Sequence, residues 1–168
     1  MKFIEQYFHC GDHLQATFAE QLGEVYDCVG AVPWKREFSL TVDGKKVAYQ
    51  TAYNKALEIE FAERGWEIQP VLMKRPRFVG DFRKHLVFVE VQFGNSATLY
   101  RDYYKFQYGL GNGLLSVAVL IVPTDPDAFF PTRVKSVHNM AKYSLAEQYL
   151  TAMPINVPTL LIGLLPEN

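Results

Sequence analysis

Apolar residues recur with two different periods along this chain, and the changes of period predict where helices and strands lie. In residues 13–29 and 50–64 they return every three or four positions, which is the spacing of an amphipathic helix. Further helices are predicted for residues 95–108 and 141–153. Asp43-Gly44 favours a two-residue turn, so the segment around it is predicted to be a hairpin.

Shorter apolar runs predict the strands. One covers residues 66–73, a short one ends at Asp81, and the others cover residues 85–93, 114–122 and 158–165. Pro70 places the first of these at an edge or a bulge, because proline cannot donate to a ladder. The run 114–122 is apolar throughout, which is typical of a buried strand flanked by helices. The order of elements predicts an α/β fold with a central mixed sheet flanked by helices.

The segment 77–95 carries the polar pattern that matters most for function. Side chains alternate between the two faces of a strand, so Glu90 and Gln92 share a face that begins apolar. If the preceding strand pairs with this one, Asp81 lies near Glu90. Two carboxylates on an apolar hairpin are costly unless a positive charge joins them. We therefore expect a divalent cation, since hard cations take oxygen ligands.

Composition limits the class of protein without deciding it. The 168 residues, 49% hydrophobic and 21% charged, predict one soluble domain spanning residues 1–168. No apolar run approaches the ~20 residues that cross a bilayer, so no membrane partner is expected. The early polar residues do not fit a signal peptide, and two cysteines do not fit a disulfide framework, so we expect a cytoplasmic protein. Those cysteines, Cys10 and Cys28, are interpreted as small buried hydrophobes, because they and the neighbouring histidines fit no zinc spacing.

The acidic and amide residues of the central segment resemble the core of the PD-(D/E)XK nucleases. In that superfamily an acidic residue and an acidic-X-Lys triplet lie on adjacent strands of a sheet between helices. Here Asp81 is followed, after eight residues, by Glu90-Val91-Gln92, so that Gln92 stands in the place of lysine. This variant is similar to the BglII/BstYI-type restriction endonucleases. Gly80 stands where the motif commonly has proline.

The resemblance, which covers roughly residues 50–140, implies a restriction-endonuclease-like domain and a chemistry. Asp81, Glu90 and the Val91 carbonyl would hold Mg²⁺, and Asp81, Glu90 and Gln92 would be the catalytic residues. Gln92 cannot act as a base, so it would only orient the attacking water. The sequence leaves open whether Glu58 or Glu60 joins the site, and whether a second metal binds.

The resemblance also implies a homodimer that cuts double-stranded DNA at a palindromic site, and it points to a site containing GATC. Asn95 matches a base-contacting position of the family, and the helix that begins there is the expected dimer contact. Seven further residues are predicted to bind DNA, four at phosphates and three at base edges. The predicted phosphate contacts are Arg83, Lys84, Arg101 and Lys105, and the predicted base-edge contacts are Arg133, Ser136 and Asn139.

Two other functions remain open from the sequence. One is a repair or mobile-element nuclease built on the same core. The other is a catalytically idle DNA-binding module, because a core that no longer cleaves need not keep the triplet lysine. The net charge of −1 does not show the basic excess of a non-specific polyanion binder, but basic residues gathered on one face would still fit a nuclease.

Overall fold

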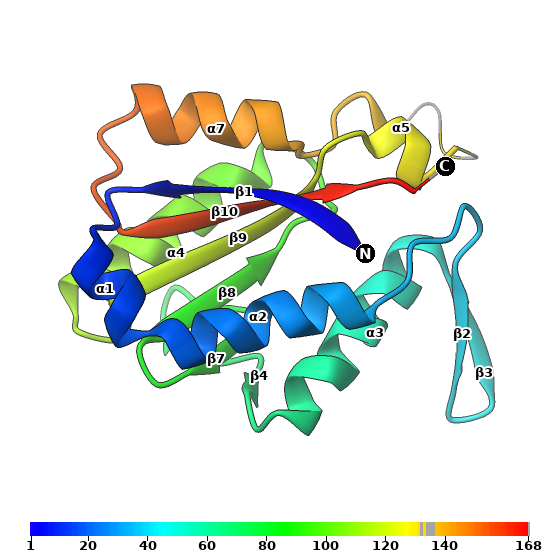
Figure 1. Ribbon diagram of the computed structural model, residues 1–168, viewed down its shortest axis with the longest axis horizontal. Coiled ribbons are helices and arrows are strands. Elements are labelled where there is room, and N and C mark those ends of the chain that lie inside the picture. The colour runs from blue at the N-terminus through cyan, green and yellow to red at the C-terminus, as the bar shows by residue number, and fades with distance from the viewer. Residues whose placement is uncertain (132, 134–136, 168) are drawn as a thin grey trace.

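Six strands form a central sheet with helices on both of its faces in the computed structural model of the chain (Figure 1). The structure describes residues 1–131, 133 and 137–167. In chain order its elements are β1 (Lys2–Phe8), α1 (Asp12–Thr17), α2 (Ala19–Ala31), β2 (Ser39–Val42), β3 (Lys45–Ala48), α3 (Tyr49–Glu63), β4 (Glu67–Ile68), β5 (Val71–Met73), β6 (Phe78–Val79), β7 (Phe82–Lys84), β8 (Val87–Val91), α4 (Thr98–Gly111), β9 (Val117–Pro123), α5 (Pro126–Phe129), α7 (Tyr143–Ala152) and β10 (Thr159–Leu165).

The central sheet has the order β1-β10-β9-β8-β7-β4, and it is mixed. Strands β8, β9 and β10 are parallel neighbours, while β1, β7 and β4 each pair antiparallel with the strand beside them. Every residue of β9 is buried, which confirms the prediction of a central buried strand. The predicted α/β fold with a central mixed sheet flanked by helices is therefore confirmed.

Each face of the sheet has its own hydrophobic core. Val87 and Val89 pack with α2 and α3 on one face, whereas Phe88 packs with α4 and α7 on the other. The alternation predicted for this strand is thus confirmed. Its consequence is that Glu90, two residues after Phe88, belongs to the face that α4 covers.

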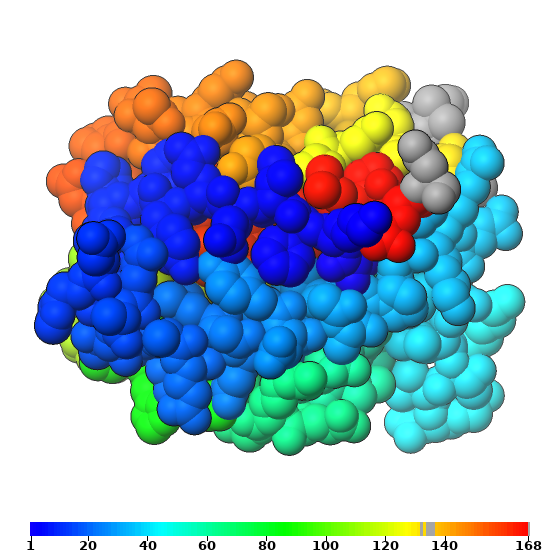
Figure 2. All heavy atoms as spheres, in the orientation of Figure 1, coloured from blue at the N-terminus to red at the C-terminus, as the bar shows by residue number. Residues whose placement is uncertain are grey.

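Two smaller hairpins lie outside the central sheet. Strands β2 and β3 pair around Asp43-Gly44, where both residues have positive φ (50° and 75°), as a tight primed turn requires. This hairpin stands at one end of the molecule and protrudes there in the space-filling view (Figures 1 and 2). The second hairpin pairs β5 with β6.

Several predicted boundaries were wrong. The helix predicted over residues 13–29 is divided at Phe18 into α1 and α2. The strand predicted over residues 66–73 is divided into β4 and β5, because Gln69 has φ 52° and Pro70 follows it. Asp81 does not end a strand but immediately precedes β7. Among the described residues, no helix is both long enough and apolar enough to cross a membrane.

Candidate active site

Asp81 and Glu90 come together because β7 pairs antiparallel with β8. Phe82 lies opposite Val89 in this ladder, so the residue before Phe82 reaches the end of β8. There the Asp81 carboxylate accepts a hydrogen bond from the Val91 N–H, at 2.7 Å between Oδ2 and N. The predicted proximity of the two carboxylates is therefore what the strand pairing produces.

Gly80, next to Asp81, lies against the Phe88 ring of β8, and its position leaves no room for a side chain. A Cβ at residue 80 would lie 2.0 Å from Cζ of the Phe88 ring. We predict that Gly80→Ala lowers the free energy of unfolding by about 1–3 kcal/mol, since the ring and β7 must shift apart. Urea denaturation measures this. Gly23→Ala in α2 is the control, because a Cβ there has no atom within 4 Å; equal stability of the two variants would contradict the packing.

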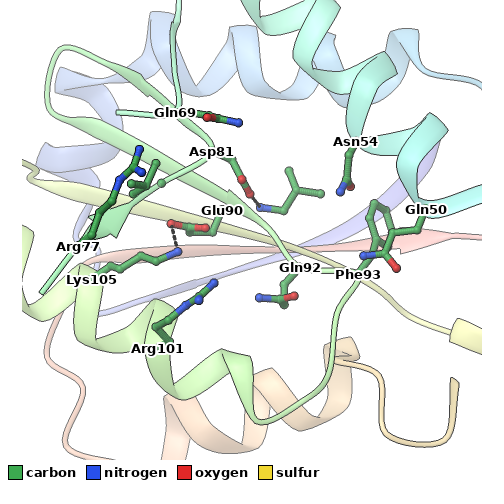
Figure 3. A pocket seen from close by; sticks show the side chains of 13 residues that line it. Gln50, Asn54, Gln69, Arg77, Asp81, Glu90, Gln92, Phe93, Arg101 and Lys105 are labelled. Atoms are coloured by element: carbon green, nitrogen blue, oxygen red, sulfur yellow. Dashed lines mark hydrogen bonds and ion pairs between the residues drawn. The ribbon is translucent and has the colours of Figure 1, made fainter. Parts of the chain in front are cut away.

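The two carboxylates line a cavity of about 450 Å³ whose walls are mainly polar (Figure 3). Side chains from α3, from the segments around β6, from β8 and from α4 contribute to it. Its lining residues are Gln50, Asn54, Gln69, Arg77, Val79, Gly80, Asp81, Glu90, Val91, Gln92, Phe93, Arg101 and Lys105. The cavity thus brings carboxylates, amides and three cationic side chains to one place, which suits a ligand that carries both negative charge and hydrogen-bond acceptors.

A chain of buried polar contacts connects β8 with α4 behind this cavity. The ammonium of Lys105 lies 2.8 Å from Oε1 of Glu90 and 3.0 Å from Oδ1 of Asp102. Gln92 donates from Nε2 to Oδ2 of Asp102 at 2.7 Å, and its Oε1 accepts from the Gly94 N–H at 2.8 Å. Glu90, Asp102 and Lys105 are at most 4% exposed.

Burial and like charges change the acidity of this group. Burial raises the pKa of Glu90 well above its ordinary value, and the carboxylates of Asp81 and Asp102 raise it further. Burial also raises the Asp81 pKa, although the Val91 N–H opposes the change. Burial lowers the Lys105 pKa, but the two neighbouring carboxylates outweigh burial, so the pKa is raised. The site therefore stabilises added positive charge.

The raised Asp81 pKa gives a prediction about stability without metal. A carboxyl whose pKa is raised by folding stabilises the fold below its unfolded pKa, near 4, and that contribution is lost as pH rises through the folded pKa. We expect metal-free Asp81→Asn to melt at a higher temperature than the unmodified chain at pH 8, because asparagine carries no charge but still accepts from Val91. The difference should shrink toward pH 4. Melting curves in EDTA test this, with Asp43→Asn as control; a difference that does not change with pH would contradict it.

The oxygen atoms present fit a hard divalent cation. The N–H and C=O of one strand residue point to the same side, and the Val91 N–H points at Asp81, so the Val91 carbonyl also faces that side. Two carboxylates and a carbonyl are ligands that Mg²⁺ accepts, with water completing its shell. No group of three or more His, Cys, Asp or Glu side chains that could hold a metal occurs in the part of the chain that the structure describes.

The predicted phosphate contacts fall into two groups. Arg101 is exposed and lines the cavity. Lys105 also lines the cavity but is buried, because two carboxylates hold its ammonium. Arg83 and Lys84 are not among the lining residues. Arg83 is paired with Glu67 of β4, and Lys84 with a glutamate of α2, Glu24. A phosphate role for these two stays a prediction, and it would require each side chain to leave its own partner.

The structure brings the predicted base-reading residues Asn95 and Asn139 together. Both are exposed, and the Ser96 N–H donates to the Asn139 carbonyl at 2.7 Å. Oδ1 of Asn95 accepts from the Ala97 N–H, so this side chain also supports the turn before α4. Arg133 donates to Oε1 of Gln50 at 3.0 Å, and Gln50 is a lining residue of the cavity. Ser136 lies outside the described residues.

Helix α3 was considered only for Glu58 and Glu60, and the contribution of Gln50 and Asn54 to the cavity was not predicted. Gln50 and Asn54 line it, and Asn54 and Glu58 line a smaller adjoining cavity of about 130 Å³. These three residues are spaced by four, so they follow one face of the helix, and this polar stripe was a readable signal. Glu60 instead pairs with Arg64, 2.7 Å away, and lines neither cavity. Gln69, Arg77 and Asp102 were not predicted as site residues either.

A mixed sheet between two helical layers, with paired carboxylates where an antiparallel strand meets a parallel one, is the arrangement of the restriction-endonuclease class of nucleases. A family model described as restriction endonuclease BglII/BglIII matches residues 3–164, and the chain belongs to this family. Its members are type II site-specific deoxyribonucleases, which hydrolyse phosphodiester bonds and typically use divalent metal ions.

A solved structure supports the fold assignment. The crystal structure of restriction endonuclease BglII complexed with a DNA 16-mer superposes with a TM-score of 0.79 and 18% sequence identity. The match covers 99% of this chain and 78% of the BglII chain. A search of curated proteins found no match.

Proposed function

We propose that this chain is a Mg²⁺-dependent homodimeric endonuclease that cuts a palindromic site in double-stranded DNA. One observation carries the proposal: Asp81, Glu90 and Val91 line one cavity at the end of β8, together with three cationic side chains. Membership of the BglII/BglIII family and the likeness to a BglII–DNA complex support DNA as the substrate.

The residues of the cavity would divide the work of phosphodiester hydrolysis. Asp81, Glu90 and the Val91 carbonyl would hold the metal, which when bound supplies a Lewis acid and lowers the pKa of water. Arg101 and Arg77 would bind oxygens of the phosphate. A water oxygen then bonds to phosphorus as one phosphorus–oxygen ester bond breaks; the water loses its proton to solvent, and the leaving oxygen takes one up.

Gln92 would have a supporting part in this reaction. An amide cannot act as a base at neutral pH, so it cannot remove the proton of the attacking water. Its Nε2 and Oε1 already bond to Asp102 and Gly94, which fixes the orientation of the amide at the cavity wall. Its second N–H remains as the group that would orient a water molecule.

The homodimer is proposed through α4, the helix that follows Asn95. Tyr100 and Tyr104 on this helix are 42% and 68% exposed, and neighbouring exposed aromatic side chains suit a contact with a partner. Together with residues before β10 they line an apolar hollow of about 180 Å³. A dimer through this surface would place two cleavage sites on one duplex.

Cleavage of plasmid and long bacteriophage DNA tests the proposed function. With Mg²⁺ we expect a fixed set of discrete fragments, and without it none. A smear would favour a repair or mobile-element nuclease, and binding without cleavage would favour an idle module. Short duplexes with palindromes centred on GATC, compared with the same duplexes carrying a scrambled centre, test the proposed recognition site.

Arg101 provides a prediction about binding. Replacing it with glutamine should weaken binding to all DNA sequences alike, and should reduce the slope of log K against log salt by about 1, as expected for one lost phosphate contact. Fluorescence anisotropy with labelled duplex in the absence of Mg²⁺ measures both. Arg36→Gln is the control, because Arg36 is exposed but does not line the cavity. An unchanged salt slope would remove Arg101 from the phosphate contacts.

A further inference from the structure

Strand β8 supplies no positive charge to the site. Gln92 is two residues beyond Glu90, on the same face, at the position where the related nuclease cores carry lysine. Its amide is bound at both ends, to Asp102 and to the Gly94 N–H, so it is turned toward α4. Strand β8 and the residue that follows it therefore offer no cation to the carboxylates of Asp81 and Glu90.

Helix α4 places a cation at this point instead. Lys105 is 3% exposed, it lines the cavity, and its ammonium lies 2.8 Å from Oε1 of Glu90. An ammonium has three N–H donors, and Glu90 and Asp102 accept two of them. The third remains for an oxygen atom of a phosphate in the cavity.

Stability does not account for this arrangement. Removing Lys105, Glu90 and Asp102 from water costs much of what their mutual attraction returns, and apolar side chains of similar volume often stabilise a fold as well or better. The neighbours of these residues on α4, such as Leu99 and Phe106, show that the same helix packs apolar side chains against β8 and β9. Glu90 and Lys105 lie at the wall of the cavity, with Asp102 behind them, so the chemistry of the cavity gives a reason for these buried charges.

We propose that Lys105 is the catalytic cation of this site, delivered from α4 rather than from β8, and that Asp102 and Gln92 hold it against Glu90. The inference rests on the proposed nuclease function and adds to it the group that offsets negative charge on the phosphate. A fixed positive charge in a water-poor site stabilises the charge that develops during attack on phosphorus. Asp102 is a positioning residue, since it reaches the cavity only through Lys105 and Gln92.

The test compares Lys105→Gln with the double variant Gln92→Lys/Lys105→Gln, which moves the lysine back to β8. Lys105→Gln removes the charge but keeps an amide that can donate to Glu90 or Asp102. We expect it to slow single-turnover cleavage of long DNA at least about 100-fold. The double variant should recover at least about tenfold of that loss, because its cation again faces Glu90 and Asp102. Lys2→Gln, on an exposed edge strand, is the control and should cleave normally.

Binding of Mg²⁺, measured by calorimetry without DNA, separates a charge from a structural support. Removing a positive charge beside two carboxylates should leave Mg²⁺ affinity equal or higher, whereas collapse of the site would lower it. Cleavage by Lys105→Gln within about threefold of the unmodified chain would overturn the proposal, as would loss of Mg²⁺ binding together with activity.

The remaining outcomes are also decisive. If the unmodified protein cleaves no DNA, the proposed function fails, but the calorimetry still tests Lys105: weaker Mg²⁺ binding by Lys105→Gln would overturn its place at the metal site, and equal or tighter binding would support it. If Lys105→Gln does not fold, the double variant carries the test. A folded double variant that cleaves supports the proposal, and a folded one that does not cleave overturns it.

Discussion

Asp81→Asn is expected to reduce the rate of DNA cleavage at least about a thousandfold, equivalent to about 4 kcal/mol of lost transition-state stabilisation. The physical reason is that asparagine removes one of the two anionic ligands of the proposed metal. It keeps an oxygen that can accept from the Val91 N–H, so the end of β8 should remain in place. Single-turnover cleavage measures the rate, and circular dichroism shows whether the fold is kept.

Asp43→Asn is the matched control for this substitution. Asp43 lies at the exposed turn between β2 and β3 and lines neither the main nor the adjoining cavity. It should cleave at the normal rate. Retained Mg²⁺-dependent cleavage by Asp81→Asn would show that the catalytic metal is held elsewhere.

Glu90→Gln should have a comparable effect on cleavage, with a different effect on metal binding from that of Lys105→Gln. Glutamine fits the space and can still accept from Lys105, but it no longer offers an anionic oxygen to the cavity. We expect a loss of at least about a thousandfold in rate. Mg²⁺ affinity should fall, whereas it should not fall in Lys105→Gln, because one change removes a ligand and the other removes a competing charge. Calorimetry on both proteins measures this contrast.

One result would contradict the role of Glu90 as a metal ligand. If Glu90→Gln binds Mg²⁺ as tightly as the unmodified chain, then Glu90 serves only as the counter-charge of Lys105. The metal site would then have to be built from Asp81 and the Val91 carbonyl alone.

Strand alternation is why the core of the site could be predicted from sequence. The period of two along residues 85–93 fixes which side chains share a face. Val87 and Val89 pack in one core, whereas Glu90 and Gln92 contact residues of α4 on the other face. A pairing of this strand with a strand ending at Asp81 was expected from their short separation in the chain; the strand that pairs with it, β7, begins after Asp81. Strand alternation and short separation along the chain are local properties of the sequence, so neither depends on the tertiary structure.

The surroundings of the site could not be predicted in this way, because they depend on contacts between distant segments. Lys105 was predicted as a phosphate contact, and its burial between Glu90 and Asp102, which supply counter-charges, was not predicted. The edge strand β1 was not predicted because most of its residues are exposed, and only pairing with β10 defines it.

Local backbone geometry explains the other errors. Gln69 lies in the left-handed region, which interrupts a strand that hydropathy alone would continue through Pro70. The same bend places the Gln69 side chain in the cavity. Gln69, which interrupts the strand, therefore also contributes to the site.

The most direct test of the account is to sequence the ends of the DNA fragments that the protein produces. Long DNA is incubated with the unmodified chain in Mg²⁺, with the unmodified chain in EDTA, and with Asp81→Asn in Mg²⁺. We predict that the first reaction gives ends that all share one palindromic sequence, and that the other two give none. Ends scattered over many sequences, or the same ends from Asp81→Asn, would contradict a site-specific, metal-dependent cleavage centre at Asp81 and Glu90.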